Sequence, residues 1–324
     1  MANTIDWGKA TQNNTNGFGK YQNTIDAGSI YADSYSGETV LIGTSAAFSY
    51  AKSSYHQDET DPTPTITGTT GGTFSATPSG LSINASTGTI DLSASTIQPY
   101  TITYTVDGVS ANFSLSVTAS PFVANTYSMQ FDGVNDYIDV GNPSSLQITG
   151  NLTLSTWVKT SMTSTGFVIS KDNLSNRNYA LVVAMDGGTL KARFFIVKNN
   201  TLVNVTSNTI NVGDNNWHHI VGVNDGTDLK IYVDGNLENT NSGAGGTIDN
   251  DSVDLNIGRR GDNNLFFSGK LDETAIWNTA LSSDAVTEIY DAANNNTGKA
   301  LDLSTDYNNY TSSSNLQYWN RLGD

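Results

Sequence analysis

Short segments that alternate apolar and polar side chains, separated by Asp-Gly turns, constrain this chain most. Tyr100–Val106 alternates with a period of two, Asp107-Gly108 follows as a hairpin turn, and the alternation resumes on the other side. The same pattern recurs between residues 127 and 235. Strands this short, with turn signals every roughly eight to twelve residues, pack as sandwiches or barrels. The sequence therefore predicts an all-β protein.

The composition agrees with many strands and excludes several classes of partner. Of 324 residues only 14% are charged, and Asn, Thr, Ser and Gly take up the difference. The length predicts two or three domains. The formal charge of −16 repels phosphate backbones, so nucleic acid is not an expected partner. The absence of cysteine excludes disulfides and thiolate metal sites. No apolar run is long enough to predict a membrane span.

Residues 1–60 differ from the rest and predict an extended anchoring arm. Asn3–Lys9 is echoed by Asn23–Ser29 in a segment rich in Gly and Asn. Regularly placed aromatic residues interrupt it, and these are Trp7, Phe18, Tyr21, Tyr31 and Tyr35. Aromatic side chains bury a large area at small entropic cost, which suits docking on another protein. The alternative is a leader without fixed structure whose aromatic residues are incidental.

Residues 61–120 predict a small β-domain that acts as a spacer. A Pro-containing linker, Asp58–Pro64, precedes it. The stretch from Pro78 through Gly80-Leu81 to Gly88 and Ile90, followed by the Tyr100–Val106 strand, resembles the Ig-like modules of bacterial and phage proteins. The resemblance implies an immunoglobulin-like sandwich with no chemistry of its own.

Residues 121–293 carry motifs of a second, larger sandwich. These are Phe131-Asp132-Gly133, Trp217-His218-His219-Ile220 followed by Leu229–Gly235, Ile257-Gly258-Arg259, and Phe267–Leu281. In this order they resemble the laminin-G and concanavalin A-like lectin domains, which implies a jelly-roll of two curved antiparallel sheets. A short helix is expected over Ser282–Ala292, with Ser282 or Ser283 as N-cap. Residues 294–324 are expected to dock through their aromatic residues, on the sandwich or on a partner.

The sequence predicts no enzyme. His218 and His219 are adjacent in a strand, so their side chains point to opposite faces and cannot share a metal. Glycosidases on this fold need two carboxylates about 5.5 Å apart on one face. The nearest pair here, Asp272 and Glu273, is consecutive and is expected on opposite sides of its sheet. No nucleophile elbow or phosphate loop is present.

The family resemblance implies a structural Ca²⁺. Related modules hold calcium with an Asp of the strand that contains Asp272 and with oxygens near the Phe-Asp-Gly turn. By position the candidate ligands are Asp132, Asn135 and Asp272, with backbone carbonyls or water completing the shell. The alternative is that Asp132 and Asn135 shape a turn and Asp272 caps a strand.

A sugar site is expected on loops at one end of the sandwich or on its concave face, with aromatic and planar polar groups. Two loops supply the candidates, which are Asp172, Asn173, Asn176 and Arg177 in one, and Arg259, Arg260, Asp262, Asn263, Asn264 and Phe266 in the other. The alternative is that both are ordinary solvated loops.

The layout as a whole comprises an arm, an Ig-like spacer, a lectin-like head and a docking tail. It resembles structural proteins of phage virions, such as head fibres, spikes or tail-associated proteins. The expectation is a non-enzymatic protein on the virion surface that is anchored to other virion proteins by its arm, binds a host-surface glycan and assembles as a homo-oligomer, a trimer being our specific expectation. Two alternatives are a purely structural capsid decoration protein and a bacterial cell-surface adhesin.

Overall fold

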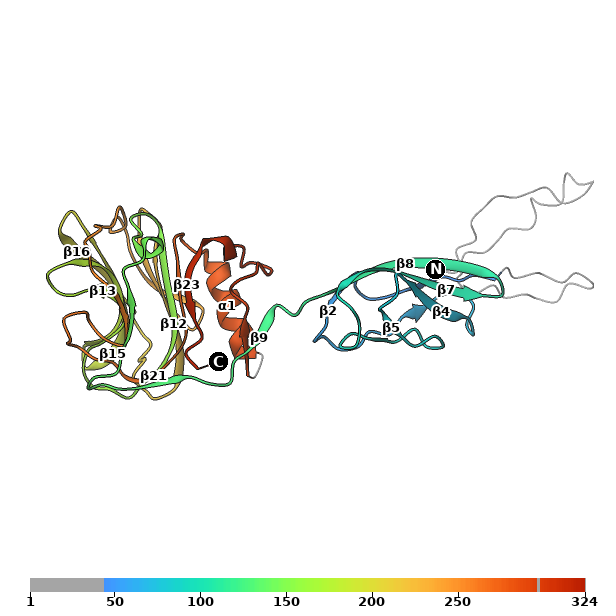
Figure 1. Ribbon diagram of the computed structural model, residues 1–324, viewed down its shortest axis with the longest axis horizontal. Coiled ribbons are helices and arrows are strands. Elements are labelled where there is room, and N and C mark those ends of the chain that lie inside the picture. Colours follow the sequence, from blue (N-terminus) through green and yellow to red (C-terminus); the bar gives the residue numbers. More distant parts are fainter. Residues whose placement is uncertain (1–43, 296–297, 324) are drawn as a thin grey trace, which may run out of the picture. The chain divides into compact units, whose positions relative to one another are not determined.

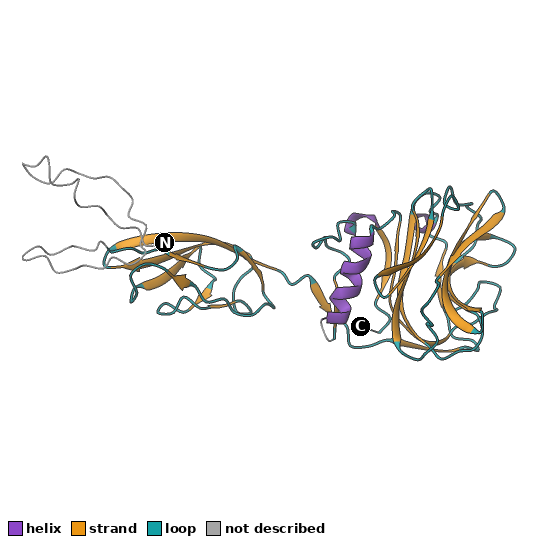
Figure 2. Cartoon of the chain, turned by 180° about the vertical axis from the view of Figure 1, so that it is seen from behind, coloured by secondary structure: helices purple, strands orange, loops and turns teal. Residues whose placement is uncertain are grey.

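The chain divides into two compact units, one ending at Ala119 and the other beginning at Ser120. The computed structural model describes residues 44–295 and 298–323. The predicted anchoring residues Trp7, Phe18, Tyr21, Tyr31 and Tyr35 lie outside the described residues. Within the described part the fold is all-β with one short α-helix, which confirms the predicted fold class (Figures 1 and 2).

The first unit contains a four-stranded sheet in the order β2-β8-β7-β4 and two strand pairs, β1–β3 and β5–β6. The strands are β1 (Phe48–Ser49), β2 (Ser54–His56), β3 (Thr65–Ile66), β4 (Thr73–Thr77), β5 (Ser82–Ile83), β6 (Ile90–Asp91), β7 (Gln98–Val106) and β8 (Val109–Thr118). The β7–β8 hairpin turns at Asp107, whose φ is 48°, and Gly108, as the Asp-Gly pair predicts.

The core of the first unit begins earlier in the chain than predicted. Tyr100, Ile102 and Tyr104 alternate into it from β7, as expected for a half-buried strand. Tyr50 and Tyr55 are buried in the same core, and β2 pairs in parallel with β8. Residues from about 46 onward therefore pack with this unit and do not precede it, which differs from the predicted boundary at residue 61. The immunoglobulin-like assignment stays a prediction.

The second unit contains two antiparallel sheets. The seven-stranded sheet has the order β10-β21-β12-β17-β18-β19, and β23 also pairs with β21. The six-stranded sheet has the order β11-β20-β13-β14-β15-β16. The first comprises β10 (Met129–Asp132), β12 (Leu152–Lys159), β17 (Trp217–Asn224), β18 (Leu229–Val233), β19 (Asn236–Asn241), β21 (Ser268–Trp277) and β23 (Leu316–Asn320), and the second β11 (Ile138–Gly141), β13 (Gly166–Asp172), β14 (Arg177–Asp186), β15 (Thr189–Lys198), β16 (Thr201–Thr206) and β20 (Leu255–Ile257).

The two sheets stack face to face and enclose one hydrophobic core (Figure 1). Leu154 and Val158 of β12 enter it from one side, and Leu181 of β14 and Phe194 of β15 from the other. The sheets approach closely at Gly222 of β17, because a β-carbon there would lie 2.3 Å from the Phe194 ring. A glycine at this position lets the aromatic ring fill the space between the sheets.

The helix α1 (Ser283–Asn295) packs on the outer face of the seven-stranded sheet (Figures 1 and 2). Ser282 Oγ accepts a hydrogen bond from the Ala285 N–H at 3.1 Å, so Ser282 is the N-cap, as predicted. Val286 and Ile289 are buried against Trp277 and other residues of the sheet. No helix in the described residues is long and apolar enough to cross a membrane.

The C-terminal residues also belong to the second unit. β23 extends the seven-stranded sheet beside β21, with Ala275 opposite Trp319. A short strand β22 (Lys299–Leu301) pairs with β9 (Phe122–Ala124), which ties the two ends of this unit together. Two short 3₁₀ turns complete it, η2 (Ser144–Leu146) and η3 (Ser313–Asn315). The tail was expected to dock either on the sandwich or on a partner, and in the structure β23 docks on the sandwich.

Candidate functional site

The outer face of the six-stranded sheet carries a second apolar cluster, separate from the sandwich core. Its members, called here the outer cluster, are Phe167, Ala180, Val182, Ala184, Phe195 and Val197. They come from alternate positions of β13, β14 and β15, whose other positions face the core. Among the described residues α1 lies on the opposite side of the sandwich, so this cluster is not covered by that helix (Figure 1).

Arginine side chains cover the outer cluster and its edge. The guanidinium carbon of Arg260 lies 5.7 Å from the centre of the Phe167 ring, and that of Arg177 lies 5.4 Å from the Phe195 ring. Arg259 stacks on Tyr137, next to the edge strand β11, at 3.2 Å. Such cation–π contacts each contribute about 0.5–1 kcal/mol at exposed sites. Three planar cations are thereby held against aromatic rings on one sheet face.

β15 contributes two further basic side chains, Lys191 and Arg193, to the same face. Arg193 lies opposite Val182 on one side and Thr206 on the other, and its Nε donates to Thr206 Oγ1 at 2.8 Å. Lys191, two positions earlier on the same face, donates from Nζ to the Asn208 carbonyl at 3.0 Å. Neither residue was predicted from the sequence. A signal for them exists, because the apolar alternation of Leu190–Ile196 places the intervening residues outward.

The two loops that were predicted to bind sugar lie side by side in the structure. The Gly261 N–H donates to the Asp172 carbonyl at 2.8 Å, and a β-carbon on Gly261 would lie 3.1 Å from that oxygen. Arg260 feels the charge of Asp172, although its pKa is raised chiefly by its hydrogen bond to Asp262. The two loops therefore form one continuous surface beside the outer cluster.

Most of the predicted sugar-binding residues bond to one another. Asp172 is 0% exposed, and its carboxylate accepts two bonds from Arg177, at 2.9 and 3.0 Å, and one from the Leu174 N–H at 2.6 Å. Arg260 binds Asp262 with two bonds of 2.8 Å. Asp172 is thus out of reach of a ligand and acts on the surface through Arg177. That these loops contact sugar stays a prediction.

The remaining candidates of the two loops shape or border the surface. Asn173 accepts a hydrogen bond from the Asn176 N–H at 2.7 Å, which fixes the first loop. Asn263 accepts one from the Arg259 guanidinium, which also donates from Nε to Asn256 at 2.9 Å. Phe266 is partly buried, whereas its neighbour Phe267 belongs to the sandwich core.

The three calcium candidates do not converge. Asp132 Oδ1 accepts the N–H groups of Val134 and Asn135, at 2.7 and 3.2 Å, and these bonds lower the pKa of Asp132. Asp132 pairs with Ser268, so Asp272 lies four positions away along β21, roughly 13 Å at the rise of a strand. The residues that the structure describes contain no group of three His, Cys, Asp or Glu placed to hold a metal. Asp132 and Asn135 serve a turn here, and the set does not fit one calcium shell.

A buried polar cluster under α1 was not anticipated. Ser155 Oγ and His219 Nε2 share a hydrogen bond of 2.7 Å, and burial lowers the pKa of His219 to about 4, which keeps it neutral. Glu273 lines the same small cavity. Its volume of about 10 Å³ leaves room for about one water molecule. A sugar cannot enter it.

The prediction that Asp272 and Glu273 point to opposite sides is wrong. Ser155 pairs with Ala275 but Trp157 pairs with Asp272, so β21 has a β-bulge, with Glu273 at φ 47°. Asp272 lies on the side of Trp157, and Glu273 lines the cavity that Trp157 also lines. Both carboxyl groups are buried, and Glu273 accepts the Trp319 Nε1–H at 2.6 Å.

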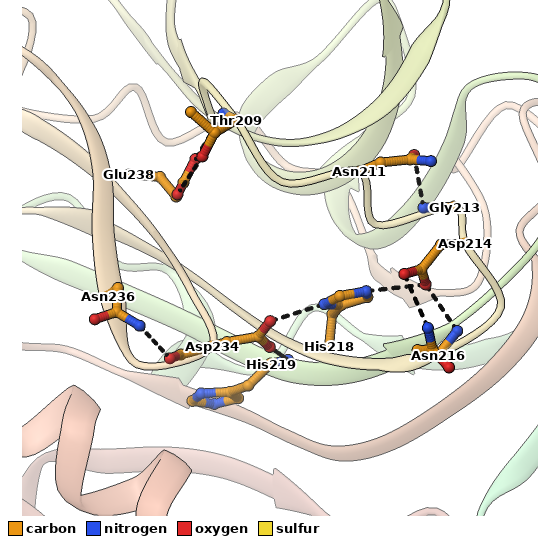
Figure 3. Close-up of polar contacts among 10 residues, drawn as sticks. All are labelled: Thr209, Asn211, Gly213, Asp214, Asn216, His218, His219, Asp234, Asn236 and Glu238. Atoms are coloured by element: carbon orange, nitrogen blue, oxygen red, sulfur yellow. Dashed lines mark hydrogen bonds and ion pairs between the residues drawn. The ribbon is translucent and has the colours of Figure 1, made fainter.

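His218, the neighbour of His219 in β17, joins a loop to a turn through two hydrogen bonds. Figure 3 shows His218 between the carboxylates of Asp234 and Asp214, with its ring nitrogens at 2.8 and 3.0 Å from them. Its pKa is raised first by the hydrogen bond to Asp234, so it is favoured as a cation. It joins the segment that contains Asp214 to the turn between β18 and β19, while His219 faces α1. The adjacent rings thus diverge, as the strand geometry predicts.

Comparison with known proteins agrees with this architecture. Residues 132–287 match the family model described as the concanavalin A-like lectin/glucanases superfamily. A 151-residue stretch is 29% identical to part of adhesion G-protein coupled receptor V1 of Danio rerio and covers 44% of this chain but 2% of that receptor. The chain thus spans a very small part of this curated relative.

Solved structures superpose on this chain at low sequence identity. A Bacteroides ovatus protein, provisionally described as carbohydrate binding, superposes with a TM-score of 0.51 at 14% identity, over 85% of this chain and 88% of that one. A heptameric SAP-like pentraxin of Limulus polyphemus gives 0.40 at 17% identity, over 50% and 81% of the two chains. The second unit, with its two stacked antiparallel sheets, therefore has the concanavalin A-like, laminin-G fold, and residues 132–287 within it match that family model.

Proposed function

We propose that the second unit binds a glycan, without catalysis, on the outer face of the six-stranded sheet. The observation that carries the proposal is the set of arginine–aromatic stacks on that face, formed by Arg177, Arg259 and Arg260. A guanidinium stacked on a ring has its plane fixed and its N–H donors directed sideways. Planar donors held in this way suit the hydroxyl groups of a sugar.

The stacked arginines retain hydrogen-bonding capacity beyond their contacts within the protein. A guanidinium has five N–H donors. Arg260 uses two on Asp262, and Arg177 uses two on Asp172. The other donors are available to water or to a ligand. Tyr137, which is 43% exposed, adds an aromatic surface at the edge of the same face.

The proposal of binding without catalysis rests on the acidic residues. Asp172 and Asp262 are both paired with arginine on the proposed face. Asp272 and Glu273 are both buried, and Glu273 lines a cavity that admits about one water. Neither arrangement offers a general acid and a nucleophile on the two sides of a glycosidic bond.

The setting that we propose is a phage virion, in which the N-terminal arm binds other virion proteins and the second unit meets a host-surface glycan. Its support is the sequence resemblance of the arm and the overall layout. Antibodies against this chain are expected to label released phage particles. Labelling of the bacterial envelope alone would favour the adhesin alternative, and labelled particles with no glycan binding would favour a decoration protein.

The test of glycan binding uses the full chain on a glycan array. The wild type is expected to bind at least one glycan saturably. Arg260→Gln removes a stacked guanidinium whose partner Asp262 is exposed, and we expect its affinity to fall about tenfold. Lys270→Gln, which removes an exposed cation from the seven-stranded sheet, is the matched control and is expected to bind as the wild type does. No saturable binding by a folded chain would contradict the proposal.

A further inference from the structure

We propose that the ligand of this face is an acidic glycan, and that Arg193 and Lys191 bind its carboxylate or sulfate group. The inference rests on the proposed glycan-binding function and specifies its ligand class. The chain as a whole is acidic, with 31 Asp and Glu against 15 Lys and Arg. A concentration of cations on one face of such a protein therefore calls for a specific explanation.

Five of those 15 basic residues lie on or beside the outer cluster, namely Arg177, Lys191, Arg193, Arg259 and Arg260. They divide into two groups by their acceptors. Arg177 and Arg260 each contact a carboxylate. The other three donate to neutral acceptors, namely the Asn208 carbonyl for Lys191, Thr206 Oγ1 for Arg193, and Asn256 and Asn263 for Arg259.

Arg193 and Lys191 share one side of β15, and their neighbours across the strands are uncharged. Val182 and Ala184 lie opposite them on β14, and Thr206 lies opposite Arg193 on β16. Lys191 bonds to the carbonyl of Asn208, and the Glu238 carboxylate accepts the N–H groups of Asn208 and Thr209. That carboxylate binds the backbone of the loop after β16, whereas the two cations donate to neutral oxygens in the described part of the chain.

Burial strengthens the attraction that Lys191 and Arg193 would exert on a bound anion. Lys191 is only 8% exposed, and Arg193 is partly buried. A cation in a partly dehydrated site interacts strongly with an anion, because little of the attraction is screened by water. Hydrogen bonds between ionised partners are also about twice as strong as neutral ones. An anionic substituent placed between Lys191 and Arg193 would supply the counter-charge that the described residues do not.

The distance between Arg193 and the stacked Arg260 gives the site a length suited to an oligosaccharide. Phe167, Val182 and Arg193 lie in one row across three strands, and Arg260 stacks on Phe167. Adjacent strands are about 4.8 Å apart, so the backbones of the row's two ends are roughly 10 Å apart. A chain of two or more sugar units can therefore contact Arg260 through hydroxyl groups and Arg193 through its acidic group.

The experiment measures binding of the full chain to three named polysaccharides, heparin, polygalacturonate and dextran. They carry sulfate with carboxylate groups, carboxylate groups alone, and no charge, respectively. We expect binding to one or both of the acidic polymers and not to dextran. Raising the salt concentration is expected to weaken that binding, because the attraction is electrostatic. Binding to both acidic polymers assigns the site to carboxylates, and binding to heparin alone assigns it to sulfates.

Two variants and one control separate a specific site from general attraction. Arg193→Gln and Lys191→Gln are each expected to lower the affinity for the acidic polymer about tenfold, the loss of one charge-assisted hydrogen bond. Lys270→Gln is expected to leave it unchanged. Near-ultraviolet circular dichroism checks that each variant is folded, and an unfolded Lys191 variant leaves the test to Arg193→Gln.

Three results would overturn the inference. Equal loss of affinity in Lys270→Gln and Arg193→Gln would show non-specific attraction. Binding to dextran as strong as to the acidic polymers would remove the acidic class but leave glycan binding in place. Absence of binding to all three polymers and to the glycan array would end both this inference and the proposed function.

Discussion

The two outer faces of the sandwich both carry apolar side chains, but the chain covers them in different ways. On the seven-stranded sheet, Val221, Tyr232 and Trp277 are buried beneath α1 and the segment that follows it. On the six-stranded sheet, Phe167 and Phe195 are buried beneath arginine side chains. One face is closed by a packed helix, and the other by long polar side chains that rest on aromatic rings.

The difference separates a structural role from a binding role. An amphipathic helix buries its own apolar face, and removing it from the sheet would expose both surfaces to water. Arginine side chains cover a ring while keeping their charged ends near solvent. A ligand can therefore reach the charged groups of the six-stranded face without unfolding anything. We assign structure to the first face and ligand binding to the second.

The largest effect is expected from a charge placed beneath α1. Ile289→Asp would bury a carboxylate among the apolar side chains of that face, and we expect a loss of about 4 kcal/mol in the free energy of unfolding. Urea denaturation followed by tryptophan fluorescence measures this, because Trp157, Trp217, Trp277 and Trp319 all lie in the second unit. Ser283→Asp adds the same charge at an exposed position of the helix and is expected to change stability by less than about 0.5 kcal/mol. Equal effects would contradict the tight packing of this face.

Acid is expected to weaken the same face through His219. Its pKa falls from 6.5 to about 4 on folding, so its neutral form is favoured in the folded protein. The associated stability is present above pH 6.5 and is lost as the pH falls toward 4, by about 3 kcal/mol in total. His219→Phe keeps an aromatic ring beside Trp157 and removes the titration. Its unfolding free energy is expected to fall less than that of the wild type between pH 6.5 and 4, and parallel curves would contradict this.

On the six-stranded face two arginine substitutions are expected to differ. Arg177→Gln leaves the fully buried Asp172 without its cation and is expected to cost about 2 kcal/mol, discounted for the partial exposure of Arg177. Arg260→Gln breaks a pair whose carboxylate, that of Asp262, is more exposed than Asp172, and it is expected to cost less than about 1 kcal/mol. Urea denaturation compares them. A larger cost for Arg260→Gln would mean that its loop supports the fold.

The smallest effect is expected from His218, which belongs to neither outer face. Its pKa is raised above 6.5 on folding, so its contribution is fully present below pH 6.5 and is lost as the pH rises through the folded value. His218→Gln is therefore expected to reduce the loss of stability between pH 6.5 and 8, in the sense opposite to His219. Thermal unfolding at several pH values measures the difference. A variant that loses as much stability as the wild type over this range would contradict the ion pairs with Asp214 and Asp234.

Much of the fold could be predicted because its central elements follow simple patterns. The alternation in β12, β14 and β15 reflects burial on one face of each strand, and Ser282 marks the start of α1. The edge strands β16 and β19 were not predicted. In β19 the sequence Asn236–Asn241 is largely polar, because an edge strand has solvent on one side.

The candidate site could be predicted only in part, because its contacts join distant segments. Two polar loops could be selected by resemblance, but that they touch at Gly261 depends on the fold. That Arg259 stacks on Tyr137 could not be predicted from residues so far apart in the chain. The bulge at Glu273 likewise overrides the alternation that a regular strand would follow.

Hydrogen–deuterium exchange of the full chain, with and without the strongest binder among heparin, polygalacturonate and dextran, tests the central claim most directly. The account predicts slower exchange on ligand binding in β14, β15 and residues 259–266, with α1 and the seven-stranded sheet unchanged. Protection confined to α1 and the seven-stranded sheet would contradict the assignment of ligand binding to the six-stranded face.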